Sequence, residues 1–381
     1  MADTTTRTRQ GIESLIRRMV KEHGSPLMLI QRGALARQYQ LFTKRLPMVT
    51  PFYAIKANPH PEIIKEFVGL GAGFDVASGT EIEWVLKAGA KPQDIIFANT
   101  IKSEKDLRFA HHNNIKTMTF DNEPELYKIA KFAPKSKVVL RIKVANVGSV
   151  VELSLKFGAD PDQAVFLLKK AKSLGLTPEG ISFHVGSQCT NIGNYIQALE
   201  VSASIFKKME KDGVPLKLLD IGGGFPIKHF DREEAPTFEN MASQLKREMR
   251  RLFGKMKQVR FIAEPGRFFV GPSGILITQV VGRAFRDNKN YYYLNDGVYQ
   301  DFSGIIFDHC KYEFKSLKRG QKFLCTLAGP TCDSLDVLSL TEELPEMDVD
   351  NIVYVKNIGA YSCASAVPAF NGFSPAKIIL I

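Results

Sequence analysis

Apolar and polar positions alternate along most of the chain in a way that predicts strands and helices in turn. Between about residues 35 and 266, short apolar runs bounded by Gly, Asn or Asp adjoin longer charged stretches such as "TEIEWVLKAG" and "DQAVFLLKKAKSLG". The eight strand candidates are "PFYAIKA", "GAGFDVAS", "DIIFAN", "IKTMTFD", "KVVLRIK", "GISFHVG", "LKLLDIGGG" and "VRFIAEPG". Eight alternating β/α units predict a (β/α)8 barrel.

After Gly266 the pattern changes to apolar runs separated by turns, with few helical stretches between them. The runs "ILITQVVGRAFRD", "NYYYLNDGVY", "QKFLCTLAGP" and "NIVYVKNIGAY" predict an antiparallel β domain. A single earlier strand, "SPLMLIQRGAL", precedes the barrel, and we expect it to join that β domain. The predicted segments are therefore 1–35 (joining the β domain), 36–266 (the barrel) and 267–381 (the β domain).

Composition narrows the class of protein. The chain has 381 residues, 44% hydrophobic and 24% charged, which is typical of a globular protein of about two domains. Its five cysteines are odd in number and widely spaced, which fits neither a disulfide framework nor a zinc site. No apolar run approaches the roughly 20 residues that span a bilayer, and the polar start lacks the apolar segment of a secretory signal. We expect a cytoplasmic protein with no metal and no membrane association.

The formal net charge of +11 raises the question of a nucleic-acid partner. Lysines and arginines are scattered with acids among them, as in "QLKREMRRLFGKMKQ", which reads as the solvated face of an amphipathic helix. No base-stacking or groove-binding motif accompanies the charge. We predict no nucleic-acid binding.

Polar residues collect where the predicted barrel strands end, which is where barrels carry catalytic groups. A polar ring on apolar strands is costly unless its members face a shared pocket. Lys56, right after an apolar run, could instead extend into water. The strand-end residues are Lys56, Asp75, Asn99, Arg141, His184, Ser187, Gly222 to Gly224, Glu264 and Arg267.

The glycine triplet in "DIGGGFP" suggests a phosphate site, although a tight βα turn is the plainer explanation. Three glycines after a strand expose backbone N–H groups to an anion. "HVGS" and "EPGR" occupy the equivalent place after two other strands, so a serine and an arginine could complete the cradle. A lysine, a phosphate cradle and an acid are together typical of a pyridoxal phosphate site, in which Glu264 would keep the pyridine nitrogen protonated.

Several motifs carry a resemblance to a known family: "FYAIKAN", "FDVAS", "FHVGSQC", "DIGGGFP", "EPGR", "NDGVY", "FDH", "GPTCDSLD" and "NIGAY". The chain resembles the fold type III pyridoxal-phosphate decarboxylases, which have an alanine-racemase-like barrel, and in particular the ornithine and bacterial ornithine/lysine decarboxylases. The resemblance runs from about Pro26 to the end, with the motifs in the family's order.

The resemblance implies a role for each site residue. Lys56 matches the lysine that forms a Schiff base with the cofactor, His184 the histidine that stacks on its ring, and Glu264 the partner of the pyridine nitrogen. Asp75 matches an aspartate near the lysine, and Arg141 an arginine that contacts the glutamate or the cofactor. The remaining cofactor-binding residues implied are Ser187, Gly223, Gly224, Gly266, Arg267 and Tyr361.

The same resemblance implies the substrate end of the site. Cys332 matches a proton donor that reaches across a dimer interface, although a free cysteine is more often a small buried hydrophobe. Asp333 and Asp308 match carboxylates that hold the distal ammonium of the substrate, next to Phe307. Taken alone, each aspartate is more plainly a surface residue.

The implied activity is decarboxylation of L-ornithine to putrescine, and also of L-lysine to cadaverine, in polyamine biosynthesis by a homodimer with shared active sites. Three alternatives remain. A diaminopimelate decarboxylase would want a basic group and usually has Glu at the place of Asp333, and the biosynthetic arginine decarboxylase is a much longer chain with inserted domains. The third is a non-catalytic homologue that binds pyridoxal phosphate or regulates another protein. One methylene is worth only roughly 1–3 kcal/mol, so the sequence does not set the preference between ornithine and lysine. A cationic substrate also leaves the basic net charge without an explanation.

Overall fold

A computed structural model describes residues 2–145, 147–149, 156–230, 233–256 and 258–381. These residues form two compact units. The barrel unit comprises Leu35–Ile227 and Glu234–Phe269, and the sheet unit comprises Met1–Ala34, Lys228–Glu233 and Val270–Ile381. The domain boundaries predicted from the sequence stay a prediction, because compactness does not test whether each part folds by itself.

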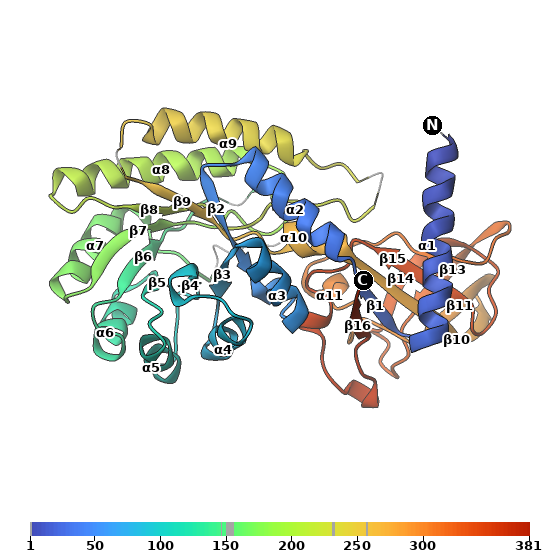
Figure 1. Cartoon of the computed structure of the whole chain (residues 1–381). Helices are drawn as coiled ribbons and strands as arrows, with labels where there is room; N and C mark the ends of the chain where they lie inside the picture. Colours follow the sequence, from blue (N-terminus) through green and yellow to red (C-terminus); the bar gives the residue numbers. More distant parts are fainter. Residues whose placement is uncertain (1, 146, 150–155, 231–232, 257) are drawn as a thin grey trace. The chain divides into compact units, whose positions relative to one another are not determined.

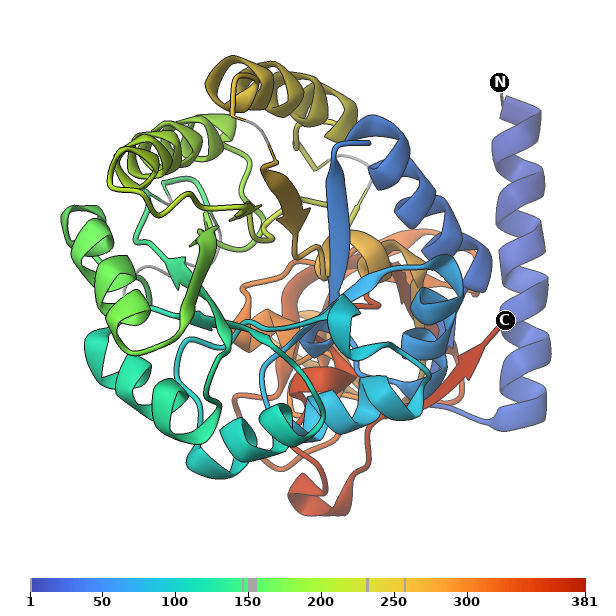
Figure 2. The same ribbon diagram turned by 60° about the vertical axis from the view of Figure 1, so that its left-hand side comes forward.

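The barrel unit is a closed ring of eight parallel strands surrounded by helices, which confirms the predicted (β/α)8 barrel (Figures 1 and 2). Its strands are β2 (Val49–Ala54), β3 (Gly73–Val76), β4 (Ile95–Phe97), β5 (Thr117–Phe120), β6 (Lys137–Arg141), β7 (Thr177–Ser182), β8 (Leu218–Asp220) and β9 (Arg260–Ala263). Its helices are α2 (Arg32–Arg45, which starts in the sheet unit), α3 (Pro61–Leu70), α4 (Gly79–Lys87), α5 (Glu104–His112), α6 (Glu123–Phe132), α7 (Ala164–Ser173), α8 (Ile192–Lys211), α9 (Phe238–Phe253) and α10 (Arg267–Val270). Single 3-10 turns are η1 (Ile55–Ala57), η2 (Pro92–Asp94) and η3 (Pro161–Gln163).

The helices begin where polar side chains cap them. Ser78, Ser103 and Asn122 each accept a hydrogen bond from the backbone N–H three residues on, at the starts of α4, α5 and α6. Thr237 caps α9 in the same way. Helix α9 begins and ends earlier in the chain than the predicted amphipathic helix "QLKREMRRLFGKMKQ". Lys257 of that stretch lies outside the described residues. Most of the strands are short apolar runs because parallel strands are covered on both faces, whereas β7 (TPEGIS) contains polar residues.

The sequence predicted that Lys56 ends a strand, and this prediction is wrong. Strand β2 ends at Ala54, and Lys56 is the middle residue of the 3-10 turn η1. The chain folds back there because the hydroxyl of Tyr53 donates to the carbonyl of Asn58 (2.8 Å) and the N–H of Asn58 donates to the carbonyl of Ile55 (3.0 Å). The turn buries Ile55 and Ala57 and leaves the lysine partly exposed.

The sheet unit contains eight paired strands, and the predicted N-terminal strand is one of them. The predicted antiparallel sheet is in fact mixed: β1 pairs antiparallel with β10 but parallel with β16, and β11 pairs parallel with β13. The pairing is mixed because long connections, including the whole barrel, lie between the paired strands. The strands are β1 (Leu27–Ile30), β10 (Gly274–Arg286), β11 (Lys289–Leu294), β12 (Lys315–Ser316), β13 (Lys322–Ala328), β14 (Val337–Pro345), β15 (Ile352–Lys356) and β16 (Lys377–Leu380).

Helix α1 (Ala2–His23) was not expected from the sequence. Its residues Ile16 and Met19 are buried against Leu27 and Leu29 of β1 and Ile277 of β10, so the helix covers one face of the sheet. The other helical pieces are α11 (Gly304–Phe307), η4 (Gly271–Ser273), η5 (Cys363–Ser365) and η6 (Phe370–Gly372). Among the described residues, every helix is too short or too polar to cross a membrane.

Candidate active site

The ammonium group of Lys56 forms an ion pair with the carboxylate of Asp75 at the C-terminal end of the barrel. Asp75 lies on β3 beside Ala54, the last residue of β2, and Lys56 lies on the turn η1 two residues later. The Asp75 side chain is 1% exposed, while that of Lys56 is 43% exposed. A buried carboxylate thus holds a lysine whose amine stays accessible to a ligand.

Glu264 and Asp220 form a hydrogen-bonded carboxyl pair after two neighbouring strands, β9 and β8. Burial raises the pKa of both groups above their ordinary values, and the negative charges of Asp220 and Asp75 raise that of Glu264 further. Asp220 also accepts a hydrogen bond from the N–H of Gly222 (2.8 Å), which favours its ionised form. Above about pH 7, where Asp220 is ionised, the pair therefore keeps one proton, and we infer that Glu264 carries it.

His184 is a neutral imidazole. Burial lowers its pKa well below the ordinary value, and the positive charges of Arg141 and Lys56 lower it further. The Nδ1 atom accepts a hydrogen bond from the N–H of Gly186 (3.1 Å), so the ring proton lies on Nε2. A Cβ atom added at Gly223 would lie 3.1 Å from Nε2, which places this glycine beside the ring.

The glycine triplet forms a loop that has no room for side chains. Gly222 and Gly224 have positive φ angles of 66° and 95°. Added Cβ atoms would lie 2.2 Å from the carbonyl oxygen of Phe183 at Gly222, 2.6 Å from that of Glu264 at Gly223 and 2.3 Å from that of Gly186 at Gly224.

The backbone carbonyls of this loop are hydrogen-bonded, whereas two of its N–H groups are not. The carbonyls of Gly223 and Gly224 accept hydrogen bonds from the Tyr195 hydroxyl and the Cys189 N–H, both at 2.8 Å. Across the described parts of the chain, no acceptor pairs with the N–H of Gly223 or Gly224. Two unpaired donors in a close-packed glycine loop are what an anionic phosphate needs.

The loops that carry Ser187 and Arg267 are fixed next to this region. Gln188, with a φ of 52°, exchanges two hydrogen bonds with the backbone of Ile227, so the loop of Ser187 is tied to the glycine loop. Gly266 ends the loop after β9, and its carbonyl accepts from the N–H of Phe269 (3.0 Å). Arg267 is the first residue of α10 and is buried.

Arg141 lies at the end of β6, and burial lowers the pKa of its guanidinium. The charges of Glu264, Asp121 and Asp75 act in the opposite direction. Sequence reasoning did not select Asp220 or Glu81, whose pKa burial also raises and whose carboxylate accepts from the N–H of Ala77. Asp220 opens the "DIGGGFP" motif, so a strand-end acid was visible, but its bond to Glu264 was not.

In the sheet unit, one buried aspartate holds the "GPTCDSLD" loop. Asp336 is 2% exposed and accepts hydrogen bonds from the N–H of Val298 (2.9 Å) and from the N–H and hydroxyl of Thr331 (3.0 and 2.7 Å). Cβ atoms at Gly297 or Gly329 would lie 2.2 Å from this carboxylate. Both glycines are therefore needed to admit Asp336, which sequence reasoning did not select.

Cys332 and Asp333 lie on this loop in an accessible position. Cys332 is exposed, and its N–H donates to the side chain of Asn371 (3.0 Å). Asp333 accepts from the N–H of Leu335 (2.9 Å) and the hydroxyl of Tyr299 (2.5 Å), and these bonds hold the pKa of its carboxyl below the ordinary value. Asp333 is thus an ionised carboxylate, and Tyr299 is a partner that the sequence did not reveal.

The other sheet-unit candidates are Phe307, Asp308 and Tyr361. Phe307 ends α11 and is 56% exposed, and Asp308 follows it, with its N–H bonded to the carbonyl of Gly304 (3.0 Å). Tyr361 has a positive φ of 52°, and its carbonyl accepts from the hydroxyl of Ser365 (3.1 Å). Their roles, like those of the other site residues, stay predictions. Within the described ranges, no cluster of His, Cys, Asp and Glu has the arrangement of a metal site.

Comparisons with known proteins point to one family. The sequence profile described as "Pyridoxal-dependent decarboxylase, pyridoxal binding domain" matches residues 32–271. The lysine/ornithine decarboxylase of Selenomonas ruminantium is 37% identical over 371 residues, covering 97% of this chain and 92% of the relative. Antizyme inhibitor 2 of Xenopus laevis is also 37% identical, over 91% of this chain and 78% of that protein.

Solved structures share the fold over nearly the whole chain. The lysine/ornithine decarboxylase of Vibrio vulnificus complexed with putrescine has a TM-score of 0.90 and 33% identity, over 97% of this chain and 98% of that one. SrLDC in complex with PLP and cadaverine has a TM-score of 0.91 and 36% identity, over 96% and 93%. The arginine decarboxylase of Paramecium bursaria Chlorella virus bound to agmatine has a TM-score of 0.91 and 32% identity, over 97% and 100%. The alignment covers the whole of this arginine decarboxylase, so the greater length expected of the biosynthetic arginine decarboxylases does not apply to it.

Proposed function

This chain belongs to the pyridoxal-dependent decarboxylases, and we propose that it removes the α-carboxyl group of L-ornithine to give putrescine, and of L-lysine to give cadaverine, as a step of polyamine biosynthesis. One observation carries the proposal: an accessible lysine paired with Asp75 lies at the same barrel end as the Asp220–Glu264 carboxyl pair and a glycine loop with unpaired N–H groups. Relatives named for this activity span nearly the whole chain.

The residues of the barrel fit pyridoxal phosphate. Lys56 would bind it covalently, and Glu264 would contact the ring nitrogen with His184 against the ring. The phosphate would be held by the free N–H groups of the glycine loop. When bound, the cofactor supplies an electron-poor ring that accepts the electron pair left by the departing CO2. The further residues proposed to hold it are Asp75, Arg141, Ser187, Gly266, Arg267 and Tyr361.

The chain's own residues prepare this chemistry. The Asp220–Glu264 pair holds one proton that Glu264 can place on a ring nitrogen, which keeps that nitrogen positive. His184 adds no charge, because its imidazole is neutral. Asp75 orients the amine of Lys56 and balances the positive charge of that amine until the substrate amine would displace Lys56. We propose that the exposed thiol of Cys332 then gives a proton to the substrate carbon.

We propose that Asp333 and Asp308, with Phe307, bind the distal ammonium of the substrate. Support comes from Asp333, whose two hydrogen bonds keep it ionised. A fixed negative charge attracts an ammonium and repels the second carboxylate of diaminopimelate. Arginine, whose guanidinium is larger than an ammonium, is the alternative substrate to consider, because the Chlorella virus relative is an arginine decarboxylase.

We further propose that the protein works as a homodimer in the cytoplasm. Large apolar side chains are exposed on the sheet unit, which is typical of an interaction surface: Phe285 is 68% exposed, Leu324 51% and Leu340 62%. The proposed partner for this surface is a second copy of the same chain. A second copy would also complete the active site, because Cys332 is exposed on its own subunit and could reach the site of its partner. All five cysteines are free thiols, which suits a reducing compartment.

Steady-state kinetics with ornithine, lysine, arginine and diaminopimelate tests the proposal. We expect ornithine and lysine to have the highest kcat/KM, with diaminopimelate at least about a hundredfold lower. Preferred turnover of arginine or diaminopimelate would contradict the substrate class. Binding of pyridoxal phosphate without turnover of any of the four would instead favour a non-catalytic homologue; the Xenopus relative is named as an inhibitor rather than as a decarboxylase.

A further inference from the structure

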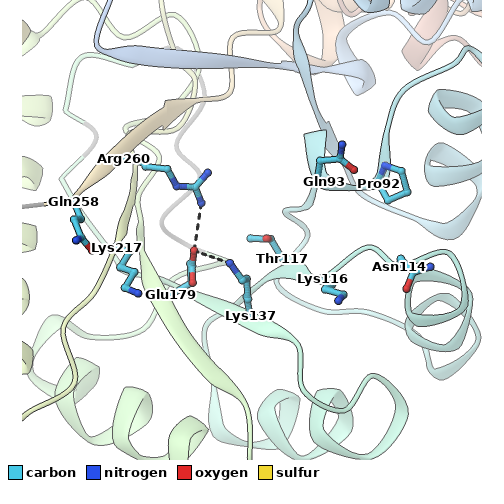
Figure 3. Close-up of a pocket in the computed structure, with 10 residues that line it drawn as sticks. All are labelled: Pro92, Gln93, Asn114, Lys116, Thr117, Lys137, Glu179, Lys217, Gln258 and Arg260. Atoms are coloured by element: carbon cyan, nitrogen blue, oxygen red, sulfur yellow. Dashed lines mark hydrogen bonds and ion pairs between the residues drawn. The ribbon is translucent and has the colours of Figure 1, made fainter.

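A cavity lies at the opposite end of the barrel strands from the residues described above. Its volume is about 690 Å3, and residues just before or at the starts of consecutive strands line it (Figure 3). This end of a (β/α)8 barrel ordinarily serves stability rather than chemistry. The charged residues in its wall are Lys116, Lys137, Glu179, Lys217 and Arg260.

Backbone hydrogen bonds place Lys116 beside Lys137, and Glu179 beside Lys217 and Arg260, and the ion pair between Lys137 and Glu179 joins the two groups. The N–H of Lys137 donates to the carbonyl of Lys116 (2.7 Å), that of Lys217 to Glu179 (2.8 Å), and that of Arg260 to Lys217 (2.9 Å). Neighbouring strands lie about 4.8 Å apart. The cationic side chains therefore start from successive positions along an arc of the barrel rim.

The charges in this wall are not balanced. Glu179, whose side chain is 6% exposed, pairs with both Lys137 (3.2 Å) and Arg260 (3.3 Å), as the dashed lines in Figure 3 mark. Among the residues that the structure describes, no carboxylate pairs with Lys116 or Lys217. Four cationic side chains thus face one carboxylate, which leaves a formal excess of three positive charges around the cavity.

We propose that this cavity binds a phosphate chain, either inorganic tripolyphosphate or the triphosphate of a nucleotide. The cations are spread along an arc rather than focused on one point, which suits an extended polyanion better than a single carboxylate. Lysine and arginine are the usual phosphate ligands in proteins. The amides of Gln93, Asn114 and Gln258 in the same wall can donate further hydrogen bonds.

The positive charge of the cavity wall excludes the substrate and the diamine product of the proposed reaction as ligands of this cavity. A basic amino acid or a diamine would be repelled by the same lysines, so this is not a product-feedback site. An anion site would also account for part of the net charge of +11, which the proposed decarboxylation leaves unexplained.

Calorimetric titration of the holoenzyme with tripolyphosphate and with ATP tests this site without measuring activity, so its outcome is independent of the decarboxylation test. The variant is Lys116→Gln with Lys217→Gln, two exposed residues whose loss should leave the fold intact, as a melting curve checks. The matched control removes two exposed lysines outside the cavity, Lys172→Gln with Lys207→Gln. Sodium sulfate at equal ionic strength tests general screening.

We expect saturable binding that weakens about tenfold or more in the cavity variant, while the control stays within about twofold of the parent. Equal affinity for tripolyphosphate and ATP would identify the phosphate chain alone as the ligand. Tighter binding of ATP would show that the nucleoside also contacts the cavity, through the uncharged residues of its wall. No saturable binding, an equal effect of sulfate, or equal weakening in the control would overturn the proposal.

Discussion

The carboxyl groups of Asp220 and Glu264 are hydrogen-bonded to each other after two neighbouring strands of the barrel, β8 and β9. Two carboxylates cannot share a hydrogen bond unless one carries a proton, so this contact fixes a proton where a cofactor nitrogen would need it. The N–H of Gly222 holds the negative charge on Asp220. The role proposed for Glu264 therefore depends on a neighbour that acts through it.

We predict that Asp220→Asn lowers kcat/KM about tenfold to a hundredfold and changes its pH profile, because the variant removes the charge that raises the pKa of Glu264. Kinetics over pH, with bound cofactor measured in parallel, checks this. Asp162→Asn, which changes an exposed acid on η3, is the control. A uniform loss of activity with an unchanged pH profile would mean that Asp220 acts only through folding.

The same pair should make the cofactor-free protein less stable as pH rises. The pKa of Asp220 is raised from 3.8 to about 7, so between these values the folded chain binds more protons than the unfolded chain. Its stabilising contribution is complete below about pH 4 and is lost by about pH 7. Urea unfolding at several pH values should give a flatter slope for Asp220→Asn, and an equal slope would contradict the shared proton.

Lys56→Ala should abolish the covalent link to pyridoxal phosphate and nearly all activity. The parent should absorb in the visible, and borohydride should bleach that band by fixing the link. Lys65→Ala, an exposed lysine on α3, is the control and should behave as the parent. A parent protein that binds no cofactor even after its addition would contradict the central claim.

Gly223→Ala should weaken cofactor binding by about tenfold or more, or roughly 1.4 kcal/mol. Its Cβ would lie 2.6 Å from the carbonyl of Glu264, so the loop must shift. Gly69→Ala is the matched control, since nothing lies within 4 Å of its added Cβ and the residue is in helix α3. Equal retention of cofactor on dialysis in the two variants would show that the loop is only a turn.

Asp333→Asn should lower kcat/KM for ornithine and lysine by roughly thirtyfold or more, since a bound ammonium loses about 2 kcal/mol or more with its counter-charge. Tyr299→Phe should raise KM more than it lowers kcat, because the hydroxyl positions Asp333. Glu210→Gln on α8 is the control. Unchanged turnover of both diamino acids by Asp333→Asn would remove this residue from the substrate site.

The sequence predicted the barrel well because short apolar runs mark most of its buried strands, and a polar residue after each run is a local signal. It placed Lys56 at a strand end rather than on η1, since the bond between Tyr53 and Asn58 that turns the chain is not a pattern. The Asp220–Glu264 bond joins residues that only neighbouring strands bring together. The parallel pairing of β11 with β13 was not predicted from the sequence for the same reason.

The last prediction concerns the proposed sharing of sites between subunits. Lys56 belongs to the barrel unit and Cys332 to the sheet unit. Each of Lys56→Ala and Cys332→Ala should be nearly inactive alone. If a twofold dimer exchanges the Cys332 loops, a mixed dimer has one site with both lesions and one site with neither.

Random exchange of equal amounts makes half of the dimers mixed, so roughly a quarter of all sites should be intact, and activity should return to about that fraction of the parent. A mixture of Lys56→Ala with Lys56→Ala carrying a distinguishable tag is the control, because it exchanges subunits but cannot form an intact site. If each site were built from one chain, every site would keep a lesion and no activity would return. Exchange confirmed by the tag with no recovered activity would therefore assign Cys332 to its own subunit, and the exposed face of the sheet unit would need another occupant.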